Sequence, residues 1–332
     1  MARKLRLEFP GACYHVINRG NYRRNLFAPQ GAAEAFERVL FEACPRFGWL
    51  LHGFVIMRNH FHLAVETPKP NLSDGMKWLQ GTWAARFNRY HGETGRPFQG
   101  RYKALHVEPG EALAAVGNYI HLNPVRAKVV PADRLGEFRW SSFWHFQQEQ
   151  RPVFLIAETL LHECGGLADT KEGWSCYRDY LAVMAEENPR QRQERQQRLS
   201  RNWCVGSQEY RQAIKRDLAM LGAKLEQAEL LGGSNEAWRQ ERQTEWEQCL
   251  QQLAADIPID LESLPRQRSA FAKVQLAVLL KAKTSVSNRW LAERLQMGPP
   301  ASVSQYVRRF RLASASGESS SENRCPLSIV NT

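Results

Sequence analysis

The sequence lacks any long apolar run. Within its 332 residues, no hydrophobic stretch approaches the ~20 residues that a membrane-spanning helix needs. The first residues, MARKLRLEFPGACYHV, are basic but have neither a long apolar core nor a small-residue cleavage site, so no signal peptide is expected. With 43% hydrophobic and 24% charged residues, the composition is that of a soluble globular protein, and the length favours two domains. No membrane partner is expected.

Cysteine is scarce and shows no pairing pattern. The chain has 7 cysteines, an odd number, and none of them forms a C-x-x-C pair. This argues against a disulfide framework and against a zinc ribbon. A reducing compartment is therefore expected, which is the cytoplasm, in association with the nucleoid if the partner is DNA.

Acidic residues are too few to balance the basic ones. The chain has 45 Lys and Arg against 34 Asp and Glu, a net charge of +11. Residues 1–150 hold 20 of the basic and 12 of the acidic residues, so this part carries +8 and the remainder only +3. A basic N-terminal half indicates a polyanionic partner, most simply nucleic acid, although a solubilising excess of charge explains the numbers equally well.

Four β-prone runs alternate with helical segments in the first half. The runs CYHVINRG, WLLHGFVIM, HFHLAVE and RYKALHVE are typical of strands, and the middle two are close enough to form a hairpin. Helical spacing predicts helices in QGAAEAFERVLFEACPRFG, in DGMKWLQGTWAARFNRYHG and, after the last strand, in GEALAAVGNYIHLN. The order β-α-β-β-α-β-α predicts an α+β fold with a ferredoxin-like, four-stranded antiparallel sheet.

Composition divides the chain into four parts. Residues 1–146 form the predicted sheet domain, on which the aromatic run FRWSSFWHF is expected to pack. Residues 147–202 are expected to be a helical extension and a linker, because EENPRQRQERQQRLSRN is too poor in apolar residues to build a core. Residues 203–313 are predicted to be all-α, with a helix-turn-helix within residues 269–311 (WLAERLQMGPPASVSQYVRRF), and residues 314–332 a disordered tail.

Two histidines stand out in the third predicted strand. His60 and His62 flank Phe61, and alternate residues of a strand share a face, so the two imidazoles project together. As neutral side chains they form a preset pair of metal ligands. The alternative is a half-exposed strand that happens to carry two histidines, which the apolar residues on both sides disfavour. His15, on the first strand, could reach the same site if that strand is central in the sheet.

The helix after the fourth strand offers groups that would complete such a site. Tyr119 and Asn123 are four residues apart and lie on one helical face. Asn123 can give an amide oxygen to Mg²⁺ or Mn²⁺, and Tyr119 can act as a phenolic nucleophile. Taken singly, a packing tyrosine and a helix-end asparagine explain these residues as well. His121 faces away from them and is expected outside the metal site.

Four motifs in this order resemble those of a known family. PGACYHVINRGN, NHFHLAVE, GRPFQGRYKA and NYIHLNPVRA resemble the single-tyrosine HUH transposases, most closely the REP-associated tyrosine transposases. HUH denotes His, a hydrophobic residue and His, here His60, Phe61 and His62, and the resemblance spans residues 5–146. It implies an HUH-endonuclease domain in which His60, His62 and Asn123 bind Mg²⁺ or Mn²⁺ and Tyr119 attacks DNA.

The resemblance also implies a partner. The expected partner is single-stranded DNA that carries hairpin-forming repeats, and relatives include monomers and dimers, so a homodimer is one expected state. Arg308, in the second helix of the helix-turn-helix, is the candidate contact outside the sheet domain. Basic residues near the predicted strand ends are the candidates for binding phosphates, namely Arg19, Arg23, Arg24, Arg58, Arg101 and Lys103.

Two other functions fit parts of this pattern. One is a sequence-specific DNA-binding regulator with a catalytically silent HUH core and the C-terminal helix-turn-helix, which the joint presence of Tyr119, His60 and His62 disfavours. The other is a metal-dependent phosphodiesterase in which water attacks in place of Tyr119. A covalent protein–DNA adduct would distinguish a transposase from both.

Overall fold

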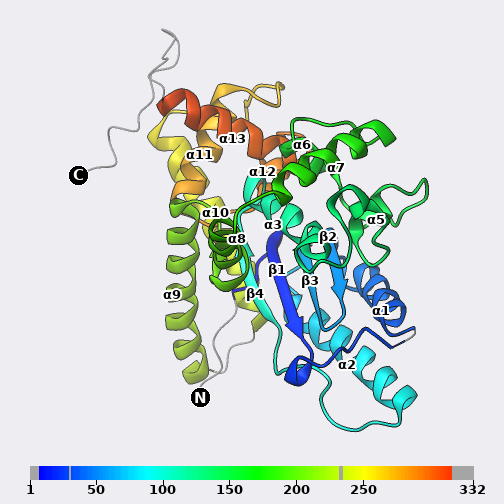
Figure 1. The fold of residues 1–332 in the computed structure, drawn as a ribbon. Coiled ribbons are helices and arrows are strands. Elements are labelled where there is room, and N and C mark those ends of the chain that lie inside the picture. The colour runs from blue at the N-terminus through cyan, green and yellow to red at the C-terminus, as the bar shows by residue number, and fades with distance from the viewer. Residues whose placement is uncertain (1–6, 30, 232–234, 316–332) are drawn as a thin grey trace. The chain divides into compact units, whose positions relative to one another are not determined.

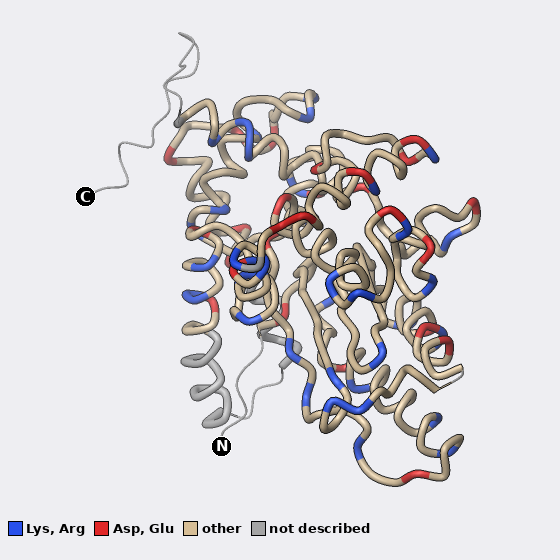
Figure 2. The backbone as a smooth tube through the Cα atoms, in the orientation of Figure 1, with Lys and Arg blue, Asp and Glu red and all other residues tan. Residues whose placement is uncertain are grey.

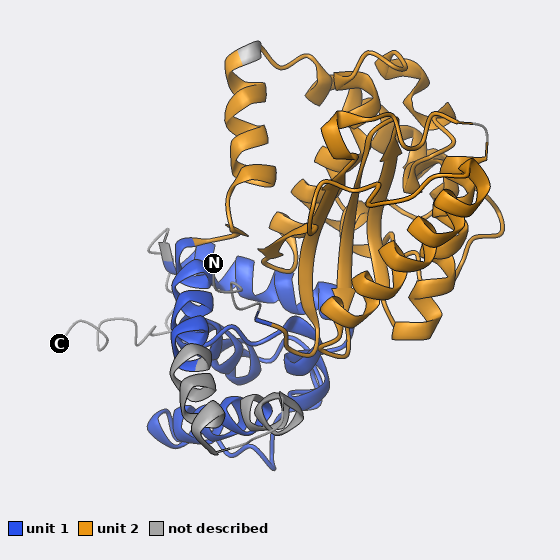
Figure 3. Ribbon diagram, turned by 90° about the horizontal axis from the view of Figure 1, so that it is seen from below, with its two compact units in different colours: residues 1–7, 208–332 blue, residues 8–207 orange. Residues whose placement is uncertain are grey.

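The computed structural model describes residues 7–29, 31–231 and 235–315. They divide into two compact units, one of residues 8–207 and the other of residue 7 with the described residues from 208 onward (Figure 3). The stretch 147–202, expected as an extension and linker, falls inside the first unit. From residue 316 onward, the predicted disordered tail lies outside the described residues.

The first unit contains the sheet, and its α+β class is confirmed. The strand order is β2-β3-β1-β4-β5, and the first four strands pair antiparallel (Figure 1). The fifth strand pairs parallel to β4 and was not predicted, because two residues are too short to give an alternating pattern. The strands are β1 (Ala12–Arg19), β2 (Leu50–Met57), β3 (His60–Thr67), β4 (Lys103–Val107) and β5 (Cys204–Val205).

One face of this sheet is covered by α1 (Ala32–Phe47) and α2 (Leu72–His91). The Phe61 ring on β3 lies 4.7 Å from the Phe36 ring of α1, which in turn lies 5.8 Å from Trp83 of α2, measured between ring centres. All three side chains are buried. Phe61 therefore points away from the face that carries its two histidine neighbours, as the strand period requires.

The opposite face is covered by α3 (Glu111–His121), which packs against β2 and β3. It is followed by the short helix α4 (Asn123–Arg126), with Pro124 in its first turn. Gly117 allows a close approach to α6 (Glu158–Glu163), because a Cβ atom there would lie 2.3 Å from Leu160 Cδ2. The extension is thus packed directly on α3.

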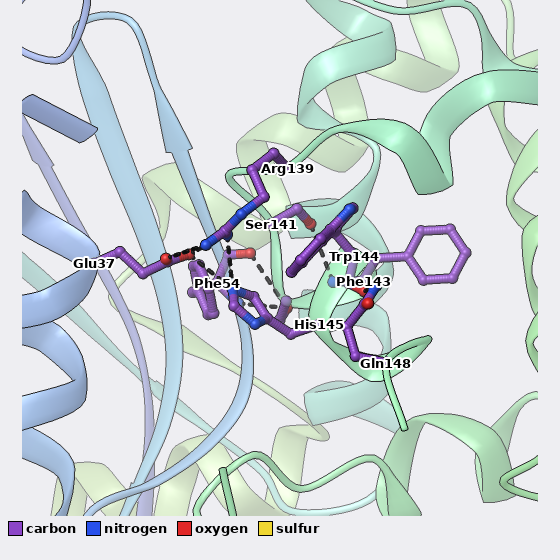
Figure 4. A network of polar contacts seen from close by, with 9 residues as sticks. Glu37, Phe54, Arg139, Ser141, Phe143, Trp144, His145 and Gln148 are labelled. Atoms are coloured by element: carbon purple, nitrogen blue, oxygen red, sulfur yellow. Dashed lines mark hydrogen bonds and ion pairs between the residues drawn. The ribbon is translucent and has the colours of Figure 1, made fainter. Parts of the chain in front are cut away.

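The aromatic segment after α4 is fixed to the sheet and to α1. It contains η2 (Ala132–Glu137) and α5 (Ser142–Phe146). Arg139 donates to Glu37 on α1 at 2.8 Å, and His145 Nε2 lies 2.7 Å from the same carboxylate (Figure 4). Burial alone would raise the pKa of Glu37, but the hydrogen bonds from His145 and Arg139 hold it below its ordinary value.

The extension continues through α7 (Lys171–Ala185) and α8 (Pro189–Gln196) into a π-helical turn, η3 (Gln197–Arg201). Leu199 is the only aliphatic residue between 186 and 202, and it is 1% exposed. It joins the core that contains residues of β4 and α3. The expectation that this stretch adds nothing to a core therefore does not hold at Leu199.

The second unit is helical in its described part. Its last two helices are joined by a turn in which Gln296 and Gly298 have φ values of 51° and 82°. α13 packs on α11 and α12 and buries Val303 and Val307, while Arg308 is exposed. No helix in the described ranges combines the length and apolarity that crossing a membrane requires. The helices are α9 (Gln208–Leu231), α10 (Asn235–Asp256), α11 (Phe271–Lys283), α12 (Asn288–Arg294) and α13 (Pro300–Ala315).

Candidate active site

Strands β1 and β3 bring three imidazoles together on the α3 face of the sheet. In their antiparallel register Arg19 is opposite His60 and Ile17 is opposite His62, which makes His15 the diagonal neighbour of His62. The ring centres of His60 and His62 are 5.1 Å apart, and those of His15 and His62 are also 5.1 Å apart. Because β1 is central in the sheet, His15 reaches this cluster.

Helix α3 adds a phenol to the three imidazoles. The ring centre of Tyr119 lies 5.7 Å from that of His62 and 5.8 Å from that of His15. The side chain is 5% exposed, and within the described ranges no residue is hydrogen-bonded to its hydroxyl group. A tyrosine hydroxyl without a protein partner beside two histidines is available for chemistry.

Asn123 lies one turn after Tyr119 and is held by its amide nitrogen. Nδ2 donates to the carbonyl oxygens of Tyr119 at 2.9 Å and Ile120 at 3.3 Å. Among the residues that the structure describes, none donates to its Oδ1, so this oxygen remains available as a ligand. The fixed amide nitrogen determines which way the oxygen faces.

Arg126 is a site residue that the sequence analysis missed. Its guanidinium carbon lies 4.8 Å from the ring centre of Tyr119, and its Nη1 is 3.4 Å from the carbonyl oxygen of that residue. Burial lowers the pKa of Arg126, while the charges of Tyr119 and Glu187 raise it. Its position seven residues after Tyr119, about two helical turns, is the sequence signal that could have found it.

Burial keeps the three imidazoles neutral. It lowers the pKa of His15 to about 4 and, with help from the charge of Arg19, that of His60 to about 4. The pKa of His62 is held well below its ordinary value by burial and then by His15 and His60. Only a neutral imidazole can give a lone pair to a metal, so protonation does not prevent His60 and His62 from acting as ligands near pH 7.

The donor atoms are compatible with a divalent metal. His60 Nδ1 donates to Asn59 Oδ1 at 2.7 Å, which leaves Nε2 of His60 with its lone pair. Across the described part of the chain, no three His, Cys, Asp or Glu side chains form a metal site, and both nitrogens of His15 already have protein partners. A site here would therefore combine His60, His62 and the amide oxygen of Asn123, which leaves positions for water and phosphate.

Some of the predicted DNA-binding residues lie beside this cluster. Arg19 ends β1 opposite His60 and is exposed, and Arg58 is exposed in the β2–β3 turn. The amide of Gly20 donates to Asn59 O at 2.7 Å, which brings the two segments together. Figure 2 shows basic backbone segments at this end of the sheet.

Other predicted contacts are already engaged or lie elsewhere. Arg24 forms an ion pair with Glu93, and Lys103 donates to backbone carbonyl oxygens of η3. Arg23 is exposed in the 3₁₀-helical turn η1 (Asn21–Arg23) that follows β1, and Arg101 is exposed in the loop before β4. Arg308 belongs to the second unit. Each of these assignments to DNA remains a prediction.

Comparison with known families identifies the first unit. Residues 9–123 match the family model described as "Transposase IS200 like". This segment belongs to the IS200-like transposase family. The family expected from the four sequence motifs is thereby confirmed, and all residues after Asn123 lie outside the matched segment.

Two solved transposase structures show a low level of similarity to this chain. One is a REP-associated tyrosine transposase bound to a REP hairpin, with 16% identity over 48% of this chain and 93% of that chain and a TM-score of 0.38. The other is a candidate transposase from Deinococcus radiodurans R1, with 20% identity over 39% of this chain and 91% of that chain and a TM-score of 0.26. No curated protein sequence matches the chain.

Proposed function

We propose that this IS200-like transposase cuts and rejoins single-stranded DNA with Tyr119 as the nucleophile. The observation that carries the proposal is the convergence of the Tyr119 ring, 5.7 Å from that of His62, with two neutral H-x-H imidazoles on one face of the sheet. A regulator with a silent core would have no need for this arrangement. The proposal extends to a ferredoxin-like HUH fold for the first four strands.

The reaction follows from the chemistry of a phenol. Tyr119 Oη attacks the scissile phosphorus, the bond from phosphorus to the 3′ oxygen breaks, and the phenolic proton ends on the released 3′-OH. The product is a 5′-phosphotyrosine ester, which keeps the phosphodiester bond energy. A second 3′-OH can therefore attack the ester and rejoin strands without ATP. The burial of Tyr119 limits access of water, which would otherwise hydrolyse the ester.

His60, His62 and Asn123 would hold the divalent metal, Mg²⁺ or Mn²⁺. When bound, such an ion neutralises charge on the scissile phosphate. Arg126 contributes independently of the metal, because its guanidinium over the Tyr119 ring places a positive charge beside the attacking group. The same contact restricts the orientation of the phenol.

The DNA partner is proposed from the same family resemblance. Arg19 and Arg58, exposed beside His60, would bind phosphates of a single strand next to a hairpin, with Arg23 and Arg101 further along. Arg24 and Lys103 would first have to release Glu93 and η3. A protein with this function would work at the nucleoid.

The second unit is proposed to bind flanking duplex DNA. α12 and α13 are consecutive helices that would serve as the predicted helix-turn-helix, and Arg308 is exposed on the second of them. If Arg308 contacts a guanine, Arg308→Ala should weaken binding to one sequence by roughly 1–3 kcal/mol, whereas a phosphate contact would weaken all sequences alike. Equal binding by the variant and the wild type would leave α13 as a packing helix.

Covalent trapping tests the proposed function. Wild-type protein and Tyr119→Phe are incubated with a labelled single-stranded hairpin substrate and Mg²⁺ and then separated on a denaturing gel. The wild type should form an adduct and the variant should form none, because the substitution removes only the attacking hydroxyl. Cleavage without an adduct would favour the water-dependent phosphodiesterase, and binding without cleavage would favour the regulator.

A further inference from the structure

His15 is buried between two hydrogen-bonding partners. Its Nδ1 lies 2.7 Å from the carbonyl oxygen of Leu199 in η3, and its Nε2 lies 2.9 Å from Nδ1 of His62. His15 is 0% exposed and His62 is 4% exposed. These contacts form a relay from the C-terminal extension through β1 to the H-x-H motif on β3.

The chemistry of the partners sets the direction of the relay. A carbonyl oxygen only accepts, so Nδ1 of His15 carries its proton. A second proton would place a charge on a fully buried ring, so Nε2 of His15 is left as an acceptor. Nδ1 of His62 must then donate to it, and Nε2 of His62 keeps its lone pair.

His60 reaches the same state by a separate route. Its Nδ1 donates to Asn59 Oδ1, whose amide nitrogen in turn lies 3.3 Å from the carbonyl oxygen of Arg23. Both histidines of the motif thus carry the proton on Nδ1 and offer Nε2. The hydrogen-bond acceptor for Nδ1 of His60 is the adjacent residue Asn59, whereas the acceptor for Nδ1 of His62 is His15 on another strand.

The turn that holds His15 is itself fixed to the sheet. The Leu199 side chain is buried in the core cluster to which Leu105 of β4 also belongs. Lys103 Nζ donates to the carbonyl oxygens of Ser200 at 2.8 Å and Arg201 at 2.6 Å. Immediately after the turn, β5 pairs with β4. Three kinds of contact with β4 therefore fix the turn that carries the Leu199 carbonyl, and this turn lies outside the family-matched residues 9–123.

We propose that His15 is a positioning residue that holds His62 with its proton on Nδ1 and Nε2 free, and that η3 holds His15 through the Leu199 carbonyl. Residues 197–205 then complete the site from outside the family-matched residues 9–123. The link to DNA cleavage rests on the proposed function, but the protonation state of His62 does not. A hydrogen-bonded partner of this kind orients a ligand ring and fixes its tautomer.

The tautomer can be measured without metal or DNA. The full-length protein, with ¹⁵N in its 9 histidines, is recorded by long-range ¹H–¹⁵N correlation, and His62 is assigned by its loss in His62→Ala. Wild-type His62 should be protonated at Nδ1. In His15→Phe it should move toward the Nε2-protonated form, and in His15→Gln, whose amide offers both a donor and an acceptor, it should return. His106→Phe, a buried histidine on β4, is the matched control and should change nothing at His62.

The result that overturns the proposal is equally direct. An Nε2-protonated His62 in the wild type, or an unchanged His62 in His15→Phe, would exclude the relay. If His15→Phe does not fold, the wild-type spectrum and His15→Gln still decide. Leu199→Ala loosens the turn and should shift His62 in the same direction to a smaller extent, and no shift there would remove η3 from the relay.

Metal affinity gives a second readout. In a Mn²⁺ titration followed by electron paramagnetic resonance, His15→Phe should bind about 10- to 100-fold more weakly than the wild type. His15→Gln should recover most of this loss, and His106→Phe should match the wild type. An adduct formed by Tyr119→Phe would refute the proposed nucleophile while leaving these results intact, whereas equal Mn²⁺ affinity in His15→Phe would refute the positioning role alone.

Discussion

One face of α3 carries Tyr119 and leads on to Asn123, while the other face carries Asn118 and His121. On the first face the tyrosine hydroxyl and the asparagine oxygen have no hydrogen-bond partner among the described residues. On the second face every polar group of His121 is used, because its Nε2 is 2.7 Å from Ser142 Oγ and its Nδ1 is 2.7 Å from Tyr177 Oη.

The second face forms one directed chain of hydrogen bonds. The Tyr177 hydroxyl donates to Asn118 Oδ1 at 2.8 Å, so His121 Nδ1 donates to Tyr177. Because burial keeps the ring neutral, its Nε2 accepts from the Ser142 hydroxyl, which also lies 3.2 Å from the Phe54 carbonyl oxygen, while the Phe54 amide donates to Ser142 at 2.8 Å. These hydrogen bonds connect α3 to β2, α5 and α7. Both faces carry polar residues, so residue type alone does not distinguish a candidate functional residue from a structural one on this helix. The hydrogen-bonding state does, because the polar groups of Tyr119 and Asn123 lack partners among the described residues and those of His121 have them.

The largest effect is expected from removing the proposed metal ligands His60 and His62, which lie on β3 beside Tyr119. His60→Ala or His62→Ala should each lower cleavage by about 10²–10³-fold, and excess chelator should do the same to the wild type. Because burial lowers the pKa of His60 to about 4, metal binding should persist at pH 5 and fail only as the pH drops toward 4. His106→Ala is the control, and undiminished cleavage in chelator would refute the metal site.

A smaller effect is expected from breaking the hydrogen bonds on the face of α3 that carries Asn118 and His121. Tyr177→Phe removes the central hydroxyl of this network, so that Nδ1 of His121 loses its acceptor and Oδ1 of Asn118 loses a donor, which should cost about 1–3 kcal/mol of unfolding free energy. Adduct formation should survive. Tyr119→Phe should keep the unfolding free energy measured in urea and lose the covalent adduct on the gel. If both variants changed unfolding free energy and adduct formation in the same way, the two faces of α3 would not differ in role.

The smallest effect is expected from lowering the pH from 7 to 6. Burial lowers the pKa of His121 from 6.5 to about 3. Between these values the unfolded chain binds a proton that the folded protein does not, so acidification below pH 6.5 should lower stability by up to ~1.4 kcal/mol per pH unit for this group. Unfolding measured at pH 7, 6 and 5 should show a shallower slope in His121→Gln. An equal slope in both proteins would contradict the buried, neutral state.

Much of the sheet unit follows from pattern, and the rest depends on contacts that a sequence does not display. The strands and the helices on both faces have clear periods, and the H-x-H spacing by itself places two imidazoles on one face. Leu199 gives no period, since it is a single apolar residue in a polar stretch. Its link to His15 spans 184 residues, and the carbonyl partners of Lys103 are 97 and 98 residues away.

Arg126 was missed for a different reason. It follows Pro124, where the helical pattern of α3 was expected to end, but the chain forms α4 and continues in helical geometry for another turn. That turn places the guanidinium over Tyr119. The predicted Tyr119 and Asn123 needed only the spacing of four within a single helical stretch.

Mass spectrometry of the trapped adduct tests the central claim most directly. The tryptic peptide of residues 104–126 contains Tyr119 as its only hydroxyl-bearing residue, with no Ser, Thr or second Tyr. After the wild type reacts with the hairpin substrate and the DNA is digested, a nucleotide mass should appear on this peptide. A nucleotide on the peptides that hold Tyr90 or Tyr102, or cleaved DNA with no modified peptide, would contradict Tyr119 as the nucleophile.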